Sequence, residues 1–357
     1  MSEVARPGIG RGAPDAEQRL LSVQGLTKYF PIKKGIISRV VGHVHAVDQV
    51  SFSIRQGETY GLVGESGCGK TTTGRLVLRL LEPTSGRVVF DGKEIFQLGS
   101  EEMRLMRRQM QIVFQDPFAT LNKRMTVGEI LAEPLEVHGV AHGREARRRV
   151  LELMYHCGLQ PQHFHSFPHE FSGGQRQRIG IARALMLSPK LVVADEPVSA
   201  LDVSIRSQIL NLMQRLQQEF GLTYLFISHD MSVVKHVCDR IGVMYLGNLV
   251  ESAPKRKLFA HPVHPYTQAL MGAIPRPNPR LRKERKGILQ GDVPSPVNPP
   301  SGCHFHTRCP YVEERCRVEA PKYEEVEPGH WVKCHLAQQL IELGPPPAAV
   351  GPHPLTP

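Results

Sequence analysis

The chain has 357 residues, enough to bury one sizeable hydrophobic core and to carry a second, smaller unit. Its hydrophobic share of 41% and charged share of 22% are those of an ordinary soluble globular protein. Because no apolar run approaches the roughly 20 residues of a membrane helix and the N-terminus lacks the apolar segment of a signal peptide, we expect a cytoplasmic chain.

The chain is basic, with a formal net charge of +10. That charge would suit nucleic acid, an anionic membrane surface or a polyphosphate. Much of the excess gathers in residues 144–149 and 276–286, where aromatic side chains are not interleaved with the basic ones. We therefore interpret both stretches as solvated faces, rank acidic lipid headgroups second, and expect no nucleic-acid partner.

Residues 1–20 show no periodicity and are rich in Gly, Pro, Arg and Ala, so we predict a disordered N-terminus. Apolar patterns then predict strands at 21–23 and 50–54, separated in part by a basic, glycine-containing insertion. Phe30, with Tyr29 beside it, lies between these strands. Its ring could stack on a nucleobase or cover a sheet edge, and composition alone favours neither interpretation.

The stretch from Gly64 to Thr72 follows a short apolar strand at 60–63 and opens a helical pattern. Its spacing, G-x-x-x-x-G-K-T, is typical of a loop whose backbone N–H groups, with the N-terminus of the next helix, bind a polyphosphate. Lys70 adds a mobile positive charge for the outer phosphates, and the Thr71 hydroxyl can ligate Mg²⁺. Strand, loop and helix in this order predict a phosphate-binding site.

Apolar spacing and turn signals predict the next elements: a helix at 75–81, strands at 87–90 and 111–115, and helices at 126–137 and 148–157. Gln115 stands where its strand meets a loop. Further on, Ser172 can cap a helix, and Gly173 and Gly174 permit a close approach to another polyphosphate. By itself this last stretch is only a capped helix start.

The apolar run 191–194 predicts a buried parallel strand that closes on Asp195 and Glu196. Asp195 can hold Mg²⁺ through water, and Glu196 can polarise the water that attacks a γ-phosphate. A helix at 205–220 and a strand at 224–228 follow, and that strand delivers His229. Alternating buried strands and helices predict a doubly wound α/β core with its ligands at the carboxyl ends of the strands.

From residue 261 the composition becomes Pro-rich and basic, and four cysteines follow at Cys303, Cys309, Cys316 and Cys334. Four thiolates can fill a tetrahedral zinc site or hold a [4Fe-4S] cluster. Zinc ribbons favour C-x2-C pairs, which are absent here, so the spacing is not that of a zinc ribbon. Nearby His304, His306 and His335 keep a mixed zinc site open, and a packed quartet without metal is the third alternative.

Taken in order, the phosphate loop, Gln115, Ser172–Gln175, Asp195–Glu196, Ser199–Asp202 and His229 resemble the motifs of the nucleotide-binding subunit of ATP-binding cassette (ABC) transporters. The resemblance covers about residues 21–260. It implies an α/β fold with a P-loop, RecA-like core, an antiparallel β subdomain and a helical subdomain at about 116–175. The signature begins with Phe171 where many relatives have Leu, at a position that is variable.

More narrowly, residues 171–184, 197–204 and 261–267 resemble the ATPases of oligopeptide/dipeptide (peptide/nickel) importers, with the F-type subunit as the nearest likeness. This likeness implies a small Cys-containing C-terminal extension at 261–340, ahead of a tail at 341–357 that we predict to be disordered. Some relatives with this extension carry a [4Fe-4S] cluster, and with the absence of C-x2-C pairs this leads us to rank the cluster above zinc.

The resemblance also implies a role for each matching residue. Glu196, His229, Lys70 and Gln115 would be the catalytic residues. Residues that bind ATP would be Phe30 (with Tyr29 as the fallback), Gly64, Ser66, Gly67, Cys68, Gly69, Lys70, Thr71, Thr72, Gln115, Asp195, Ser172, Gly173, Gly174, Gln175 and Asp202. Thr71, Gln115 and Asp195 would hold Mg²⁺, and Cys303, Cys309, Cys316 and Cys334 the cluster or zinc.

By the same resemblance, ATP is hydrolysed between this chain and a second ABC ATPase subunit, a D-type sister in a heterodimer. The pair would lie peripherally on the cytoplasmic face of the cell membrane, against two transmembrane permease subunits, and an extracytoplasmic solute-binding protein would act indirectly. The implied function is ATP-driven uptake of oligopeptides or dipeptides. Alternatives are an importer of nickel or another solute, a soluble ABC ATPase, a redox-sensing module and a nucleic-acid binder.

Overall fold

The computed structural model describes residues 19–35, 38–274 and 291–344. Residues 1–18 and 345–357 of the segments predicted to be disordered lie outside this part, as do 276–286 of the basic sequence. The first strand already begins at Arg19 and the last helix ends at Leu343, so ordered structure reaches slightly into both terminal segments.

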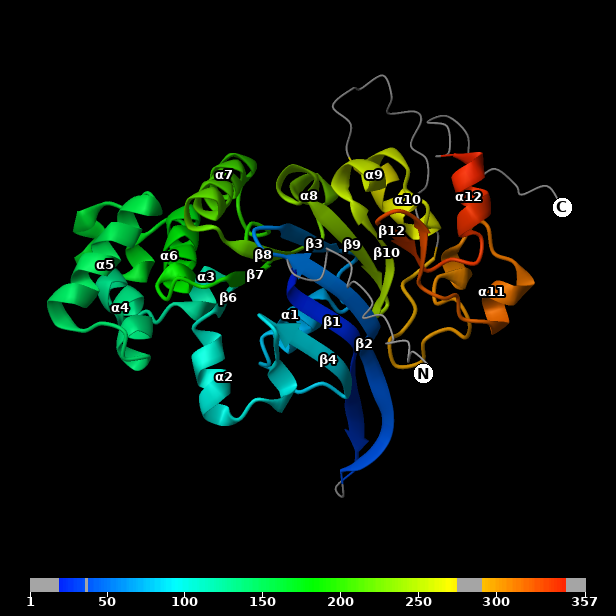
Figure 1. Ribbon diagram of the computed structural model, residues 1–357, viewed down its shortest axis with the longest axis horizontal. Helices are drawn as coiled ribbons and strands as arrows, with labels where there is room; N and C mark the ends of the chain where they lie inside the picture. The colour runs from blue at the N-terminus through cyan, green and yellow to red at the C-terminus, as the bar shows by residue number, and fades with distance from the viewer. Residues whose placement is uncertain (1–18, 36–37, 275–290, 345–357) are drawn as a thin grey trace, which may run out of the picture.

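A larger sheet runs through the centre of the described chain (Figure 1). Its strands, in spatial order from one edge, are β6 (Met110–Val113), β7 (Leu191–Asp195), β8 (Thr223–Ser228), β3 (Thr59–Val63), β9 (Arg240–Tyr245), β10 (Asn248–Pro254), β12 (His330–Val332) and β11 (Glu324–Glu327). Neighbours from β6 to β9 are parallel, and β10, β12 and β11 continue the sheet in antiparallel pairs. The residues of β3, β7 and β8 are buried, which explains their unbroken apolar runs.

The register of the parallel strands brings their carboxyl ends together. Val63 at the end of β3 pairs with Ser228 at the end of β8, and Asp195 at the end of β7 pairs with Ile227. Residues that follow these strands therefore lie along one edge of the sheet, where open α/β sheets bind their ligands.

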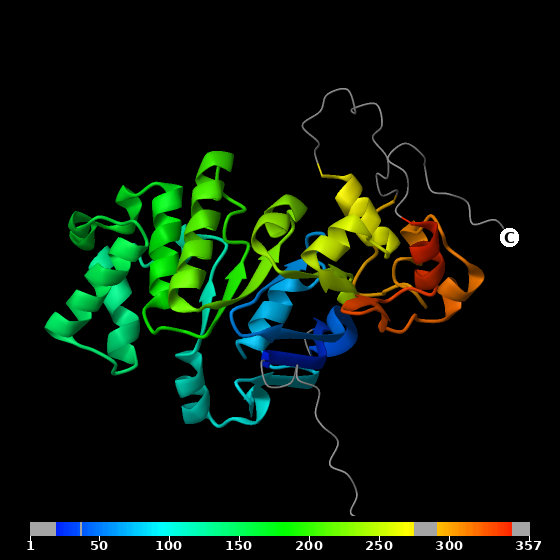
Figure 2. The same ribbon diagram turned by 45° about the horizontal axis from the view of Figure 1, so that its top comes forward.

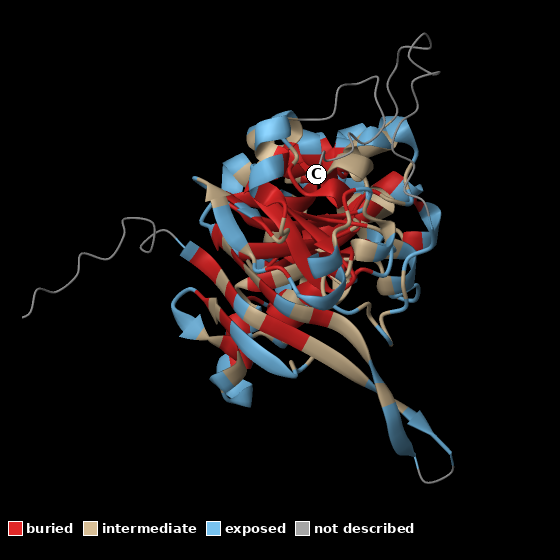
Figure 3. Cartoon of the chain, turned by 90° about the vertical axis from the view of Figure 1, so that its right-hand side faces the viewer, coloured by how far each residue is buried: buried red, intermediate tan, exposed pale blue. Residues whose placement is uncertain are grey.

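A smaller antiparallel sheet packs against the first one and consists, in the described chain, of β2 (Arg39–Arg55), β1 (Arg19–Lys34), β4 (Ser85–Phe90) and β5 (Lys93–Glu94). The segments predicted as strands at 21–23 and 50–54 belong to the long β1–β2 hairpin, and the supposed insertion is part of its arms. Figure 3 shows the exposed far end of this hairpin projecting from the buried centre.

Helices surround the sheets: α1 (Lys70–Val77), α2 (Ser100–Arg107), α3 (Pro117–Thr120), α4 (Val127–Val137), α5 (Gly143–His156), α6 (Gly173–Leu185), α7 (Val203–Phe220), α8 (Met231–Val237), α9 (Lys255–Ala260), α10 (Pro265–Gly272), α11 (Glu314–Val318) and α12 (Ala337–Leu343). Short 3-10 helices lie at Ile95–Gln97, Pro161–His165, Pro168–Glu170 and His306–Arg308. The helix expected at 75–81 starts earlier, because it begins at the phosphate loop, and ends at Val77. The predicted capping box opens α4, where the Thr126 side chain accepts from Glu129 N at 3.3 Å.

The C-terminal part of the chain is built onto the larger sheet, as Figures 1 and 2 show from two directions. Strand β12 pairs with β10, with Ser252 opposite Trp331, and β11 pairs with β12. Its own small apolar cluster includes Val263, Tyr311 and Leu340. In the described residues, no helix is both long and apolar enough to cross a membrane.

Candidate functional site

The phosphate loop joins the end of β3 to the first residue of α1. Its backbone depends on glycine at Gly64 (φ 153°) and Gly69 (φ 105°), where a side chain would be strained. A Cβ atom at Gly64 would collide with the carbonyl oxygen of Met244, and one at Gly69 with that of Ala46. The loop is therefore seated tightly against β2 and β9, and the N-terminus of α1 adds its positive potential.

Lys70 is folded into the curve of this loop. Its side-chain ammonium donates to the carbonyl oxygens of Gly64 and Glu65, both at 2.9 Å, and the residue is only 4% exposed. These acceptors are neutral, so they do not cancel the charge of the ammonium. The loop thus holds a positive charge where a polyphosphate would bind.

Thr71 and Asp195 meet across the sheet edge. The Thr71 hydroxyl donates to Asp195 Oδ1 at 2.8 Å, although the residues are far apart in sequence. Burial raises the pKa of Asp195, and the bond from Thr71 opposes that effect. A hydroxyl and a carboxylate are oxygen ligands of the kind that Mg²⁺ prefers, so this pair fits the ion.

The carboxylate of Glu196 contacts two further polar side chains. Gln115 Nε2 donates to Glu196 Oε2 at 3.2 Å, and His229 Nδ1 lies 3.1 Å from the same oxygen. The Glu196 side chain is 15% exposed, whereas that of His229 is 54% exposed. Gln115 and His229, which follow β6 and β8, therefore converge on the carboxylate of Glu196, which follows β7.

The aromatic candidates Phe30 and Tyr29 are neighbours in β1 and so point to opposite faces. The Tyr29 hydroxyl donates to Asp48 at 2.8 Å, and its ring lies 4.2 Å from that of His45, centroid to centroid. Burial and the contact with Asp48 raise the pKa of Tyr29 to about 12. Phe30 is half-buried, like Tyr29, and the ammonium of Lys28 lies over its ring at 5.1 Å, so this ring already contacts a cation.

The glycine-rich stretch at Ser172 forms a helix start. Ser172 Oγ accepts from Gln175 N at 3.3 Å, and Gln175 Oε1 accepts from Ser172 N at 3.0 Å. A Cβ at Gly174 would collide with Ile205 of α7, so this glycine also permits the packing of two helices. Asp202 is the N-cap residue of α7. Figures 1 and 2 show α6 well to one side of α1.

Sequence reasoning missed the contacts of Glu65, the second residue of the phosphate loop. Its carboxylate pairs with both terminal nitrogens of Arg308, at 2.9 and 3.1 Å. Its backbone N–H donates to the Tyr266 hydroxyl at 2.8 Å. Neither partner is near in sequence, and no local pattern marks them.

The predicted [4Fe-4S] or zinc site at Cys303, Cys309, Cys316 and Cys334 is wrong. Within the described residues, which include all four cysteines, no group of three or more His, Cys, Asp or Glu side chains could hold a metal ion. Cys309 and Cys334 pack against apolar clusters instead, and burial raises the pKa of each to about 12. Cysteines that lie close together in the sequence therefore contact apolar side chains in the described structure.

Profiles of known families match two parts of the chain. The profile described as ABC transporter matches residues 47–199, and that of the oligopeptide/dipeptide transporter C-terminal region matches residues 250–316. The oligopeptide transport ATP-binding protein AppF of Bacillus subtilis is 53% identical over 323 residues, which cover 90% of this chain and 98% of that protein. The putative oligopeptide transport ATP-binding protein YkfD of the same organism is 55% identical over 295 residues, or 82% of this chain and 90% of that one.

A solved structure is similar as well. The dimeric ATP-binding cassette MJ0796, in a post-hydrolysis state bound to ADP and Pi, has a TM-score of 0.59 and 30% sequence identity. The match covers 66% of this chain and 99% of that one. The likeness covers the nucleotide-binding fold and confirms the predicted fold class, whereas the metal-binding character predicted for the extension is the part that fails.

Proposed function

Since this chain belongs to the ABC transporter family of ATP-binding proteins, we propose that it couples ATP hydrolysis to the uptake of oligopeptides or dipeptides through a membrane importer. The chain is an ABC-type ATPase, a class that binds ATP with Mg²⁺. The peptide as cargo rests on the C-terminal region and on relatives described as oligopeptide transport proteins.

The observation that carries the ATPase mechanism is the set of contacts at the strand ends. Lys70 lies in the phosphate loop, and Thr71 donates a hydrogen bond to Asp195. The Glu196 carboxylate contacts the side chains of Gln115 and His229. In the proposed reaction Lys70 and the loop N–H groups bind the β- and γ-phosphates. Thr71, Asp195 and Gln115 would hold Mg²⁺, which neutralises phosphate oxygens when bound.

Glu196 is the proposed general base. Its carboxylate takes a proton from the attacking water while the new oxygen–phosphorus bond forms and the bond to the ADP oxygen breaks. The bond from Gln115 would orient the carboxylate. We assign to His229, which lies 3.1 Å from the same carboxylate, the role of steadying the γ-phosphate. Phe30, rather than Tyr29, is the proposed stacking surface for adenine, because the Tyr29 ring already packs against that of His45 and its hydroxyl is bonded to Asp48.

The placement of α6 to one side of α1 in Figures 1 and 2 supports a two-subunit site. We infer that Ser172, Gly173, Gly174 and Gln175 face the ATP of a second ATPase subunit, with Asp202 near the same boundary. A membrane importer also supplies permease subunits as partners. We further propose that the second ATPase subunit is a D-type sister, that the importer has two permeases, and that a solute-binding protein acts with it. The chain would lie peripherally on the cytoplasmic face of the membrane and would divide into a nucleotide-binding domain at 21–260 and an extension at 261–340.

Substitution Glu196→Gln tests this function in the complex with its permeases, reconstituted in vesicles. The change removes the base but keeps the shape of the side chain, so ATP hydrolysis and peptide uptake should fall at least a hundredfold while ATP binding persists. Glu152→Gln, on the exposed face of α5, is the matched control and should transport normally.

Uptake that survives in Glu196→Gln would contradict the mechanism. Wild-type vesicles that hydrolyse ATP and accumulate nickel, but no peptide, would replace the cargo while leaving the ATPase assignment in place.

A further inference from the structure

The contact between Arg308 and Glu65 joins the C-terminal extension to the phosphate loop. Arg308 ends the short helix His306–Arg308, and its two terminal nitrogens bind the two carboxylate oxygens of Glu65 at 2.9 and 3.1 Å. The Arg308 side chain is only 5% exposed. A bidentate, largely buried arginine–carboxylate pair holds both side chains in a defined orientation and also neutralises the charge of the carboxylate.

The backbone of Glu65 also bonds residues other than Arg308. Its N–H donates to the Tyr266 hydroxyl at 2.8 Å, and its carbonyl accepts from Lys70 Nζ at 2.9 Å. Glu65 is therefore held by two residues of the extension, Tyr266 of α10 and Arg308, and by the lysine that serves the phosphates. A shift of Arg308 would move a carbonyl that positions Lys70.

The charge of Glu65 gives the contact a further role. A carboxylate in a loop that binds a polyphosphate repels its ligand, because both carry negative charge. The side chain of Glu65 is 27% exposed, so water screens that repulsion only in part. Arg308 brings a full positive charge within hydrogen-bonding distance and cancels it locally.

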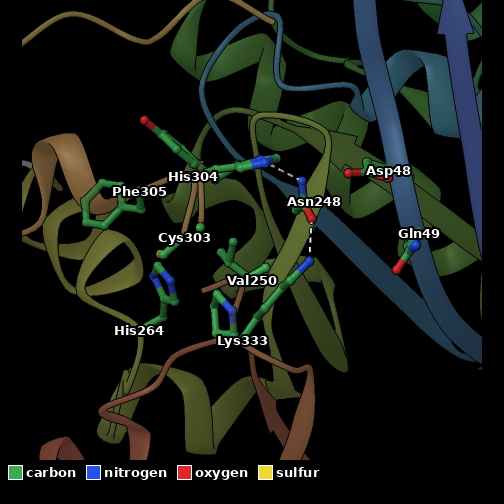
Figure 4. A pocket seen from close by; sticks show the side chains of 13 residues that line it. Asp48, Gln49, Asn248, Val250, His264, Cys303, His304, Phe305 and Lys333 are labelled. Atoms are coloured by element: carbon green, nitrogen blue, oxygen red, sulfur yellow. Dashed lines mark hydrogen bonds between the residues drawn. The ribbon is translucent and has the colours of Figure 1, made fainter. Parts of the chain in front are cut away.

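The extension also supports the other half of the loop. Lys333 Nζ donates to Asn248 Oδ1 at 2.5 Å, and Asn248 Nδ2 lies 3.0 Å from His304 Nδ1, at the side of a cavity of about 200 Å³ (Figure 4). Asn248 follows the β9–β10 turn, where Gly247 N donates to the carbonyl oxygen of Cys68 at 3.0 Å. The extension thus braces a turn that bonds the phosphate loop.

We propose that Arg308 is a positioning residue through which the C-terminal extension sets the affinity of the phosphate loop for MgATP. It acts by cancelling the charge of Glu65, the loop residue whose carbonyl accepts from Lys70. The inference rests on the ATP site described under Proposed function and adds to it a dependence on the extension.

Isothermal titration of the purified full-length chain with MgATP tests the inference. In Arg308→Gln the Glu65 carboxylate has lost its partner and repels MgATP. The Kd of this variant for MgATP should therefore be roughly tenfold higher than that of the wild type, and the difference should be smaller at high salt. The double variant Glu65→Gln/Arg308→Gln carries neither charge and should recover most of the wild-type affinity. A purely structural arginine would not be rescued in this way. Arg317→Gln, which removes an exposed arginine of the same extension, is the control.

In the assembled ATPase, Arg308→Gln should raise KM for ATP by a similar factor and leave kcat nearly unchanged, because Glu196 and His229 are untouched. If Arg308→Gln does not fold, Glu65→Gln alone decides, and it should bind MgATP at least as tightly as wild type. Weaker binding by Glu65→Gln, unchanged binding by Arg308→Gln, or no rescue in the double variant would overturn the inference. A wild-type chain that binds no MgATP would overturn the proposed function and this inference with it.

Discussion

Glu196 adopts a backbone conformation that is unusual for its residue type. Its φ is 48°, in the left-handed region that side chains other than glycine seldom enter. Bonds from Ser199 N and Ser199 Oγ to its carbonyl, and from its own N–H to Ile227 O, hold it there. This turn directs the carboxylate toward Gln115 and His229, and backbone strain of this kind is common where a site must be preorganised.

The two aromatic candidates at the start of the chain differ in what they already contact. Phe30→Ala should remove a stacking surface and raise the Kd for ATP about fivefold, equivalent to about 1 kcal/mol. Tyr29→Phe should instead remove the bond to Asp48 and lower the free energy of unfolding by about 1 kcal/mol. Nucleotide titration and urea unfolding of both variants measure the two effects. Loss of binding in Tyr29→Ala together with normal binding in Phe30→Ala would reverse the assignment.

At the scale of elements, α10 shows how a buried cap connects the extension to the nucleotide site. His264 is the N-cap of α10, where its Nδ1 accepts from Tyr266 N at 3.1 Å, and Tyr266 contacts Glu65. Because His264 is buried, its pKa falls from 6.5 to about 3. The folded chain therefore keeps this imidazole neutral, as its role as an acceptor requires.

This shift predicts a dependence of stability on pH. In the unfolded chain His264 takes up a proton below about pH 6.5, whereas in the folded chain it stays neutral down to about pH 3. Its contribution is thus complete above pH 6.5 and is lost as the pH falls, by about 2 kcal/mol between pH 7 and pH 5. His264→Asn keeps a capping acceptor without titrating, so its urea-unfolding free energy should fall less over that interval. Equal pH slopes for the two proteins would contradict this account.

At the scale of the whole molecule, a buried acid joins the extension to the main sheet. Glu251 in β10 is fully buried and accepts from His330 of β12 at 2.7 Å. It also accepts from the backbone N–H groups of Val263 and His264, at 2.8 and 3.0 Å. The Glu251 carboxylate of β10 therefore bonds both β12 and the segment that leads into α10.

Glu251→Gln should loosen this junction, because an amide nitrogen would face N–H donors where an acceptor is needed. We expect a loss of roughly 2 to 3 kcal/mol in the free energy of unfolding. Hydrogen exchange should quicken in residues 291–344 and also in the phosphate loop, since the extension braces that loop. Glu324→Gln, at an exposed position of β11, should leave both unchanged. Faster exchange confined to the extension would show that the two parts are not coupled.

The sequence by itself determined the features that depend on local spacing. Short patterns predict the phosphate loop with Lys70 and Thr71, the buried strands that lead to Asp195 and His229, and the capping box at Thr126. They do so because turns, caps and apolar periods act over a few residues. Only the tertiary structure decided which distant side chains meet. Arg308 finds Glu65, and the four cysteines pack instead of surrounding a metal ion, because such contacts depend on how whole elements dock.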